Sequence, residues 1–384
     1  MNVGIDGSNI RVGGGVTHLV QLLLAAQPRD HGIERVIVWG ARRLLDRLPE
    51  RSWLDRRHEP VLDGPLLQRL LWQRLRLPRL ARRHCDLLFA PGGSAPHRFS
   101  PVVTMCQNLL PFDPPERARY GLSGTRIRLH LLRSSQGRAF RRADGLIFLS
   151  EHSRVVVSGI LPGLRRTCVI PHAVDDAFRI PPRPQRSIAS CSPDDPFKLL
   201  YVSIVDVYKH HVEVARAVSR LRGAGVPIAV DFVGSSYPPA LRSLRAVMRE
   251  LDPQGSFLRY RGPSPYEELV RWYRDADAFV FASSCETFGI ILLEAMAAGL
   301  PIASSDRGAM PEILADSGVL FDPEDVDSTT RALRRLSADA DLRQRLADAA
   351  HARARDFTWE HCAGRTLAFL REAWEKSGAR TNGC

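Results

Sequence analysis

The stretch AFVFASSCETFGIILLEAMAAGLP, residues 278–301, contains the pattern that decides the fold. Its apolar start predicts a buried strand over 278–282, and the apolar residues over 289–298 predict a helix. Glu286 lies in the loop between them, and Glu294 follows near the second turn of the helix. The first amides of a helix suit an anion and carboxylates suit hydroxyl groups. We therefore expect a site here for a molecule with both groups, such as a sugar nucleotide.

The composition is that of an ordinary globular protein of about two domains. The chain has 384 residues, 44% of them hydrophobic and 25% charged. No run of 18 apolar residues is present, and the first residues lack the basic region and cleavage site of a signal peptide. The seven cysteines are scattered, which fits reduced thiols better than disulfides or a zinc site. These features predict a cytoplasmic protein.

Strand-like and helical patterns alternate along both halves of the chain. The predicted strands lie at 2–5, 35–39, 87–90, 102–105, 145–149 and 168–170, and then at 199–203, 228–233, 257–260, 279–282, 301–304 and 318–321. Helical crossovers between such strands indicate parallel sheets that are covered on both faces. The predicted fold class is therefore α/β.

A proline-rich stretch without periodicity over 179–196 predicts a linker. Residues 1–178 then form an N-terminal Rossmann-like domain, and residues 197–358 form a C-terminal one. The final helix, within 359–384, is expected to pack back on the first domain. Ligands of open α/β sheets bind at the carboxyl ends of the strands, which predicts a cleft between the two domains.

Several motifs in combination resemble the family 4 retaining glycosyltransferases, the bacterial glycosyl transferases group 1 type. Besides the E-x7-E pair of Glu286 and Glu294, the matching segments are 170–175, 199–203 followed by Lys209, 298–302, 308–312 and 357–359. They cover residues 170–375 closely and the first half loosely. The resemblance implies the GT-B fold, with two Rossmann-like parallel-sheet domains facing a central cleft. It also implies that the second domain binds the nucleotide-sugar donor and the first domain the acceptor.

The resemblance assigns roles to individual residues of the donor site. Glu294 would hold the ribose hydroxyls, and Glu286 would hold a hydroxyl of the donor sugar. The amides of Phe288, Gly289 and Ile290 would bind the diphosphate, with Lys209 reaching across from the loop that follows Ser203. Without the family, Lys209 would be interpreted as a solvated loop residue.

The chain departs from the family pattern at two positions. Ser203-Ile204 stands where the family has Gly-Arg, so one cation for the diphosphate is missing, and Arg261 or Arg307 could replace it. Gln107 stands about where many relatives carry a histidine. Because an amide cannot act as a base, Gln107 argues against any mechanism that needs a titrating group there. Glu286, Lys209 and Gln107 form the predicted catalytic set.

Three strand-end loops of the first half are candidates for binding phosphate and acceptor. The glycine-rich turn at 10–18 lacks the Gly-x-Gly-x-x-Gly spacing of a dinucleotide site. A plain strand–helix turn remains the alternative for it, whereas the family places it beside the donor phosphates and the acceptor. The candidate residues of the three loops are Gly13, Gly14, Gly15, Gly92, Gly93 and Asn108.

No metal or cofactor is expected. Asp275-Ala276-Asp277 matches the Asp-x-Asp of the other major glycosyltransferase fold only superficially, since it ends a helix where a carboxylate caps or faces water. His210 and His211 are interpreted as polar residues at a helix start.

The net charge of +12 comes almost wholly from arginine. The segment 66–83 combines leucines, Trp72 and six arginines, and 126–142 is similar, so both could lie on an anionic membrane surface. The alternative is a solvated arginine face over a buried leucine stripe. A nucleic-acid partner is not expected, because no nucleic-acid module is present.

The sequence thus predicts a metal-independent hexosyltransferase type of enzyme that acts with retention of configuration. Its donor would be a nucleotide-diphosphate sugar, and its acceptor a glycan, a lipid-linked molecule or a small molecule. Lipopolysaccharide or exopolysaccharide biosynthesis at the inner face of the membrane is the first interpretation. Glycosylation of a natural product is an alternative, and a non-catalytic sugar-nucleotide binder is another.

Overall fold

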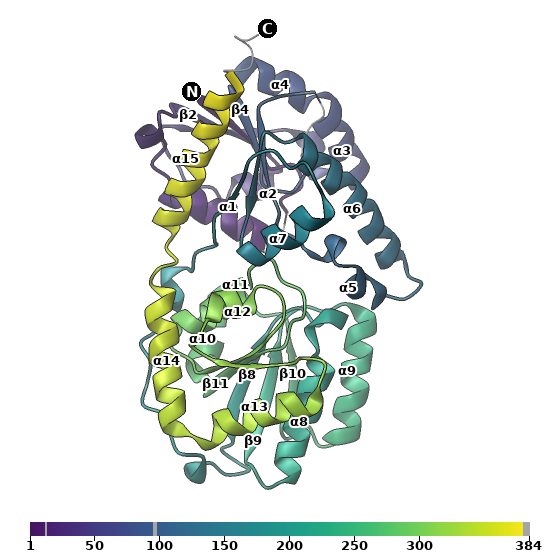
Figure 1. Ribbon diagram of the computed structural model, residues 1–384, viewed down its shortest axis with the longest axis vertical. Coiled ribbons are helices and arrows are strands. Elements are labelled where there is room, and N and C mark those ends of the chain that lie inside the picture. Colours follow the sequence, from purple (N-terminus) through teal and green to yellow (C-terminus); the bar gives the residue numbers. More distant parts are fainter. Residues whose placement is uncertain (12–13, 95–97, 379–384) are drawn as a thin grey trace. The chain divides into compact units, whose positions relative to one another are not determined.

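The computed structural model describes residues 1–11, 14–94 and 98–378, which form two compact units (Figure 1). Unit 1 comprises Met1–Pro114, Leu122–His172 and the chain from Thr358 onward. Unit 2 comprises Pro115–Gly121 and Ala173–Phe357. Unit 1 is therefore built from three separate parts of the chain, and the proline-rich segment 179–196 lies within unit 2.

Unit 1 contains a parallel sheet of seven strands in the order β3-β2-β1-β4-β5-β6-β7. The inner strands are short and apolar because helices cover both faces of a parallel sheet, and β4, β5 and β6 are buried along their whole length. The strands are β1 Asn2–Asp6, β2 Arg35–Gly40, β3 Leu54–His58, β4 Leu87–Ala90, β5 Val102–Met105, β6 Gly145–Phe148 and β7 Thr167–Val169.

The edge strand β3 has no counterpart among the strands predicted from the sequence. Its residues Leu54–His58 read Leu-Asp-Arg-Arg-His, and none of them is fully buried. A strand at the edge of a sheet pairs on one side only and tolerates charged side chains, which also discourage pairing with other chains. The apolar pattern used for prediction is therefore absent from β3.

The helices of unit 1 flank this sheet. They are α1 Gly14–Ala25, α2 Arg42–Leu45, α3 Leu66–Leu75, α4 Leu77–His84, α6 Gly124–Arg142, α7 Glu151–Ile160 and α15 Trp359–Gly378, whereas α5 Pro114–Ala118 belongs to unit 2 except for its first residue. In Figure 1 the yellow α15 lies beside the purple α1, against which it packs. A Cβ atom added at Gly145 of β6 would lie 2.9 Å from Cε1 of Phe369. The final helix thus completes unit 1.

Trp72 is part of the interior and not of a lipid-facing surface. Its side chain is 3% exposed and packs in a cluster with Trp39 and Leu77. The indole Nε1 donates a hydrogen bond of 3.2 Å to Oε2 of Glu59. The prediction that Trp72 inserts into a membrane surface is therefore wrong. Leucines are distributed around the whole of α3, so the sequence does not show which side packs on the sheet, and in the structure that side carries Trp72.

Unit 2 repeats the architecture with six parallel strands in the order β10-β9-β8-β11-β12-β13. The strands are β8 Phe197–Val202, β9 Ile228–Val233, β10 Leu258–Gly262, β11 Ala278–Phe281, β12 Ile302–Ser305 and β13 Val319–Phe321. The helices are α8 His211–Gly223, α9 Pro238–Leu251, α10 Tyr266–Asp275, α11 Ile290–Ala297, α12 Met310–Leu314, α13 Val326–Ala338 and α14 Ala340–Ala354. All six strands predicted for this half of the chain are present.

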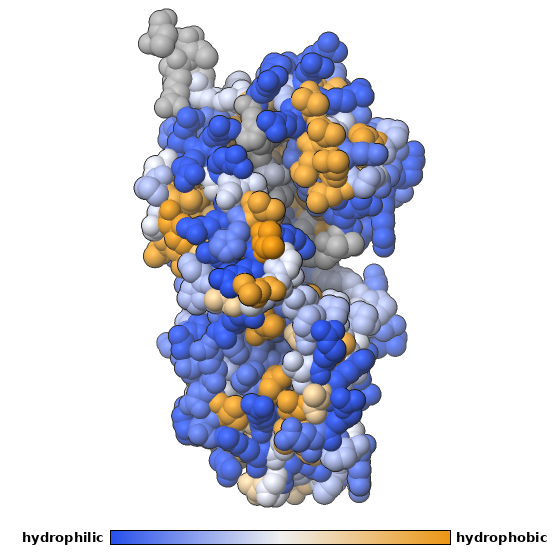
Figure 2. All heavy atoms as spheres, turned by 90° about the vertical axis from the view of Figure 1, so that its right-hand side faces the viewer, coloured by the Kyte–Doolittle hydropathy of each residue, from blue (hydrophilic) through white to orange (hydrophobic). Residues whose placement is uncertain are grey.

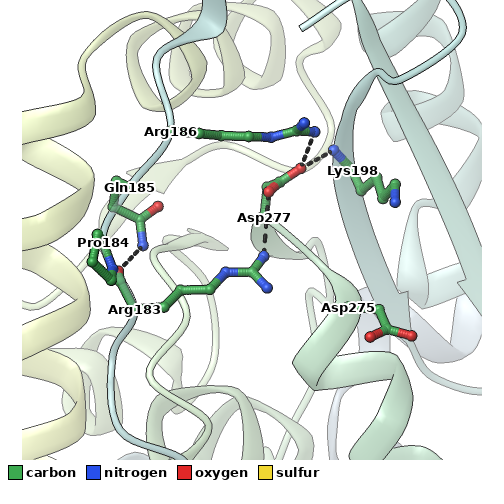
Figure 3. A pocket seen from close by; sticks show the side chains of 7 residues that line it. All are labelled: Arg183, Pro184, Gln185, Arg186, Lys198, Asp275 and Asp277. Atoms are coloured by element: carbon green, nitrogen blue, oxygen red, sulfur yellow. Dashed lines mark hydrogen bonds and ion pairs between the residues drawn. The ribbon is translucent and has the colours of Figure 1, made fainter. Parts of the chain in front are cut away.

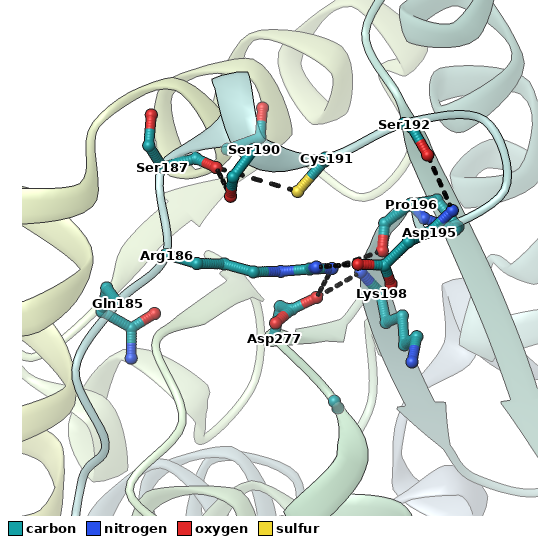
Figure 4. A network of polar contacts seen from close by, with 12 residues as sticks. Gln185, Arg186, Ser187, Ser190, Cys191, Ser192, Asp195, Pro196, Lys198 and Asp277 are labelled. Carbon is teal, nitrogen blue, oxygen red and sulfur yellow. Dashed lines mark hydrogen bonds and ion pairs between the residues drawn. The ribbon is translucent and has the colours of Figure 1, made fainter.

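Ion pairs hold the proline-rich segment against the start of β11. Asp277 accepts hydrogen bonds from Arg183 at 3.2 Å and Arg186 at 2.8 Å, and from the backbone amide of Lys198 at 2.8 Å. These residues line a cavity of about 400 Å³, in which Figure 3 shows Asp277 pointing to the arginines while Asp275 points away. Figure 4 shows Arg186 extended between Asp277 and Asp195, to which it also pairs at 2.7 Å. Asp277, the second aspartate of the Asp-x-Asp stretch, thus holds both arginines and the backbone amide of Lys198 in place.

No helix among the described residues is both long enough and apolar enough to cross a membrane.

Candidate functional site

The candidate site of unit 2 lies where the strand order of its sheet reverses. Strands β8 and β11 are neighbours in the middle of the sheet, although two other strands separate them in sequence. Loops that follow two such strands diverge and leave room for a ligand at their carboxyl ends. The loop after β8 carries Lys209, and the loop after β11 carries Glu286.

Lys209 and Glu286 form an ion pair between these two loops. The Lys209 side chain is 4% exposed and that of Glu286 is 18% exposed, so the pair is largely withdrawn from solvent. The ammonium group also lies 5.0 Å from the ring centroids of Tyr208 and Phe281. Aromatic faces attract cations, so the two rings help to hold the ammonium group in place.

Backbone and side-chain hydrogen bonds fix the Lys209 loop. The hydroxyl of Tyr201 donates to the Lys209 carbonyl and accepts from the amide of Ala282 at 3.2 Å. The amide of Ser284 donates to the Tyr208 carbonyl at 2.9 Å. Since Tyr201 belongs to β8 while Ala282 and Ser284 follow β11, the two loops are tied together and the Lys209 position is set by the sheet.

His210 and His211 take part in hydrogen bonding and packing within unit 2. His210 has a left-handed backbone conformation with φ of 47°, and its Nε2 lies 3.1 Å from Oγ of Ser284. His211 is buried and stacks on Tyr201 with 4.3 Å between ring centroids, and burial holds its pKa well below the usual value. Across the described ranges, no group of three or more His, Cys, Asp or Glu side chains is arranged to hold a metal ion.

Gly289 and helix α11 present backbone amides beside Glu286. Gly289 precedes the helix with φ of 85°, a conformation that favours glycine, and the first amides of a helix have no partner within it. Phe288 is buried and its ring lies 5.8 Å from that of Phe357, so it anchors the turn. A Cβ atom at Gly308 would lie 3.3 Å from the Glu286 amide nitrogen, which explains a glycine in the loop after β12.

Glu294 is a buried carboxylate of α11 with an aromatic partner. Its side chain is 6% exposed, and its Oε2 accepts a hydrogen bond of 2.8 Å from the Tyr273 hydroxyl. The pKa of Glu294 is raised to about 7, chiefly by burial, with the Tyr273 hydrogen bond opposing the rise and the charge of Asp175 adding to it. The carboxyl group therefore changes its charge near neutral pH.

The two arginines considered as replacements for the missing cation are both paired. Arg261 lies on the edge strand β10, and its Nε donates a hydrogen bond of 2.5 Å to Asp231 on the neighbouring strand β9. Strand β9 separates β10 from β8, the strand that leads to Lys209. Arg307 pairs with Asp322 at 2.8 Å and with Asp306 at 3.1 Å. Ser203 is buried at the end of β8, where its hydroxyl bonds to the Ile204 carbonyl at 2.8 Å.

In unit 1 the predicted loops also follow neighbouring strands. Gln107 follows β5, and Gly14 and Gly15 lie in the first turn of α1. A Cβ atom added at Gly15 would lie 3.5 Å from Oε1 of Gln107. Gly92 and Gly93 follow β4, and Gly93 has a φ of 73°. Oδ1 of Asn108 accepts a hydrogen bond of 3.1 Å from the Leu110 amide, so one of its polar atoms shapes the loop. Gly13 lies outside the described residues.

Sequence reasoning did not identify the aromatic residues that support the charged groups. Tyr208 adjoins Lys209 in the chain, and Tyr273 lies near the end of α10 with no motif around it. Asp175 belongs to the segment 170–175 that carries the family resemblance, but its effect on the pKa of Glu294 depends on the fold, which brings the two residues together. The one signal in the sequence that could have indicated Tyr208 is that it directly precedes Lys209.

Comparison with known proteins finds a family match for part of the chain. Residues 184–353 match the family model of the glycosyl transferases group 1. The O-antigen chain mannosyltransferase B of Escherichia coli is 33% identical over 138 residues, which are 34% of this chain and 36% of that protein. The D-inositol 3-phosphate glycosyltransferase of Xylanimonas cellulosilytica is 30% identical over 226 residues, which are 56% and 54% of the two chains. The chain thus spans about half or less of the length of these curated relatives.

Solved structures resemble the chain over nearly its whole length. Sucrose-phosphate synthase from Thermosynechococcus elongatus has a TM-score of 0.75 at 19% identity, covering 98% of this chain and 99% of its own. HepE from Anabaena, in complex with UDP and glucose, has a TM-score of 0.68 at 17% identity, covering 97% and 100%. At such identity the likeness shows the fold. The predicted α/β class with two Rossmann-like parallel-sheet units of the GT-B type is confirmed.

Proposed function

Because residues 184–353 match the family model of the glycosyl transferases group 1, we propose that the protein is a retaining glycosyltransferase. It transfers a sugar from a nucleotide-diphosphate sugar to an acceptor hydroxyl, and unit 2 binds the donor. The observation that carries this proposal is the Lys209–Glu286 ion pair at the point where the strand order reverses, beside the N-terminus of α11.

In this proposal each charged group meets a different part of the donor. The Glu294 carboxylate accepts hydrogen bonds from the ribose hydroxyls, and Glu286 binds a hydroxyl of the transferred sugar. Lys209 and the amides at Phe288, Gly289 and Ile290 bind the diphosphate. Donor binding then replaces the Lys209–Glu286 contact with two new ones, since the diphosphate takes the ammonium group and the sugar takes the carboxylate.

The chemical step needs no base from the protein. The acceptor hydroxyl attacks the anomeric carbon from the face that the diphosphate leaves. The bond from the acceptor oxygen to that carbon forms while the bond to the diphosphate oxygen breaks, and a diphosphate oxygen takes the hydroxyl proton. Catalysis comes from positioning and from stabilising the charge on the leaving diphosphate, for which Lys209 and the amides serve without a metal ion. Gln107 contributes a hydrogen bond.

Two variants separate the roles of the glutamates. Glu294→Ala should abolish measurable turnover through weak donor binding, because the ribose loses its carboxylate partner. Glu286→Gln should retain binding of the free nucleotide diphosphate and lower the rate, because Glu286 contacts the sugar. Isothermal titration with UDP, the nucleotide in the HepE complex, and a turnover assay measure the two effects. Glu250→Gln, at an exposed position of α9, is the control. Equal loss of UDP binding in both glutamate variants would contradict the assignment.

For the biological role we propose the assembly of a cell-surface glycan on the cytoplasmic side of a membrane. The description of the Escherichia coli relative as an O-antigen chain mannosyltransferase supports this. Glycosylation of a small natural product is the alternative function, and the D-inositol 3-phosphate glycosyltransferases among the relatives favour a small acceptor. Detectable turnover of any sugar nucleotide would eliminate a non-catalytic binding role.

A further inference from the structure

A large groove crosses unit 1 between α3 and α6. Its volume is about 900 Å³, and it begins at Asn9, after β1, and at Gly92, Gly93 and Ser94, after β4. Strands β1 and β4 are the neighbours between which the strand order of the seven-stranded sheet reverses. The groove therefore opens at the position in unit 1 that corresponds to the Lys209–Glu286 site in unit 2.

The groove is strongly cationic. Its described lining residues include five arginines and no acidic residue: Arg11, Arg69, Arg74, Arg128 and Arg138. None of these five forms an ion pair within the part of the chain that the structure describes. Helices α3, α4 and α6 together contain eleven arginines and no aspartate or glutamate. Much of the positive net charge is thus gathered on this side of unit 1.

The floor of the groove holds polar groups with unused hydrogen-bonding capacity. Arg69 is half-buried and is held by the Ser8 carbonyl at 3.1 Å and Oδ1 of Asn9 at 3.3 Å. Within the described residues, its buried Nε and the buried Oε1 of Gln136 have no hydrogen-bond partner. Burial, and repulsion from Arg11, lower the pKa of Arg69, so an anion would relieve an unfavourable arrangement of charge. Gln73 completes the floor by bonding to Ser94 Oγ at 2.8 Å.

One wall of the groove is apolar. Leu66 and Leu70 of α3 line it together with Leu132 of α6. All five leucines of α3 are at least 43% exposed, which is unusual for a helix of a soluble domain. Helices α3 and α6 lie on the right-hand side of Figure 1, the side that Figure 2 shows, and apolar atoms gather there in its upper half.

We infer that this groove binds an anionic amphiphile whose phosphate-bearing headgroup meets the arginines and whose apolar chain lies against Leu66 and Leu70. The inference rests on the proposed function in one respect, because it assigns this amphiphile as the acceptor. A nucleic acid would use the arginines but leave the leucines exposed, and a free phosphate would use neither Leu66 nor Leu70. Only a ligand with both chemical parts uses the whole groove.

The test is titration of the full chain with dihexanoyl phosphatidylglycerol as a monomer, without donor. We expect saturable binding that is about tenfold tighter than that of dihexanoyl phosphatidylcholine or glycerol phosphate. Arg128→Gln and Arg138→Gln should each weaken binding about fivefold. Leu66→Ser combined with Leu70→Ser should also weaken it, because apolar contact is lost. The matched controls are Arg141→Gln and Leu67→Ser, which lie on the same two helices outside the lining and should have no effect.

Several results would overturn the inference. Equal affinity for glycerol phosphate would reduce the groove to an anion site, and equal affinity for the choline lipid would remove the role of the arginines. Binding to phosphatidylglycerol vesicles but not to the monomeric lipid would make this side of unit 1 a membrane-docking surface without a groove site. Binding of an oligonucleotide but of neither lipid would assign a nucleic-acid partner. Because UDP binding is measured separately on unit 2, loss of lipid binding alone refutes only this inference.

Discussion

Glu294→Gln should stabilise the free protein in a way that depends on pH. The rise of the Glu294 pKa from 4.5 to about 7 means that the fold disfavours its ionised form. At about 1.4 kcal/mol per pH unit this corresponds to about 3 kcal/mol. Between these two pH values the folded protein holds a proton that the unfolded chain has lost. The stability of the wild type therefore falls as the pH rises from 4.5 to about 7, and the full cost is present above pH 7.

Glutamine removes this dependence and can still accept the Tyr273 hydrogen bond. The free energy of unfolding of Glu294→Gln minus that of the wild type should be small near pH 4.5 and should increase by about 3 kcal/mol by pH 8. Urea unfolding at four pH values and constant ionic strength measures it, with Glu250→Gln as the control. The gain should accompany weaker UDP binding. A difference that stays constant with pH, or that falls toward pH 8, would refute the reasoning.

Three further predictions concern unit 2. Lys209→Ala should weaken UDP binding about tenfold to a hundredfold through loss of a charge-assisted hydrogen bond, whereas Ile204→Ala should change it little; similar effects in calorimetry would contradict the role of Lys209. Asp277→Asn should lower the free energy of unfolding by about 2 kcal/mol because Arg183 and Arg186 lose the negative charge and one of the two acceptor oxygens at this position, while Asp275→Asn at the exposed position should not; thermal unfolding compares the two. Sugar transfer should continue in excess EDTA, and magnesium-dependent recovery after chelation would show that a metal ion carries the diphosphate charge.

The periodic patterns were sufficient to predict the two sheets, because buried parallel strands are apolar along their whole length. Strands β9, β4 and β5 are found at the residues expected. Strand β3 could not be found in this way, since an edge strand with an Asp-Arg-Arg sequence lacks the apolar pattern. Trp72 was assigned to the surface because leucines and arginines surround it, and only packing against Trp39 determines which side of α3 faces inward.

The candidate site was partly predictable for a similar reason. Lys209 and Glu286 are 77 residues apart, and it is the adjacency of β8 and β11 that brings them together. The motifs identified both residues, but not the aromatic rings on which Lys209 rests. The pKa of Glu294 depends on burial and on Tyr273 and Asp175, which come from other elements. Such effects belong to the folded environment and leave no pattern in the local sequence.

The packing of α15 on unit 1 has a consequence for how the protein is made on the ribosome. The second part of unit 1 ends at His172, and its third part begins only at Thr358. At about 5–20 residues per second, roughly 10–40 s pass between the synthesis of these two parts. During this interval α1 and β6 lack the helix that covers them, while all of unit 2 is being synthesised. Unit 1 therefore cannot complete its fold until the residues of unit 2 have been synthesised.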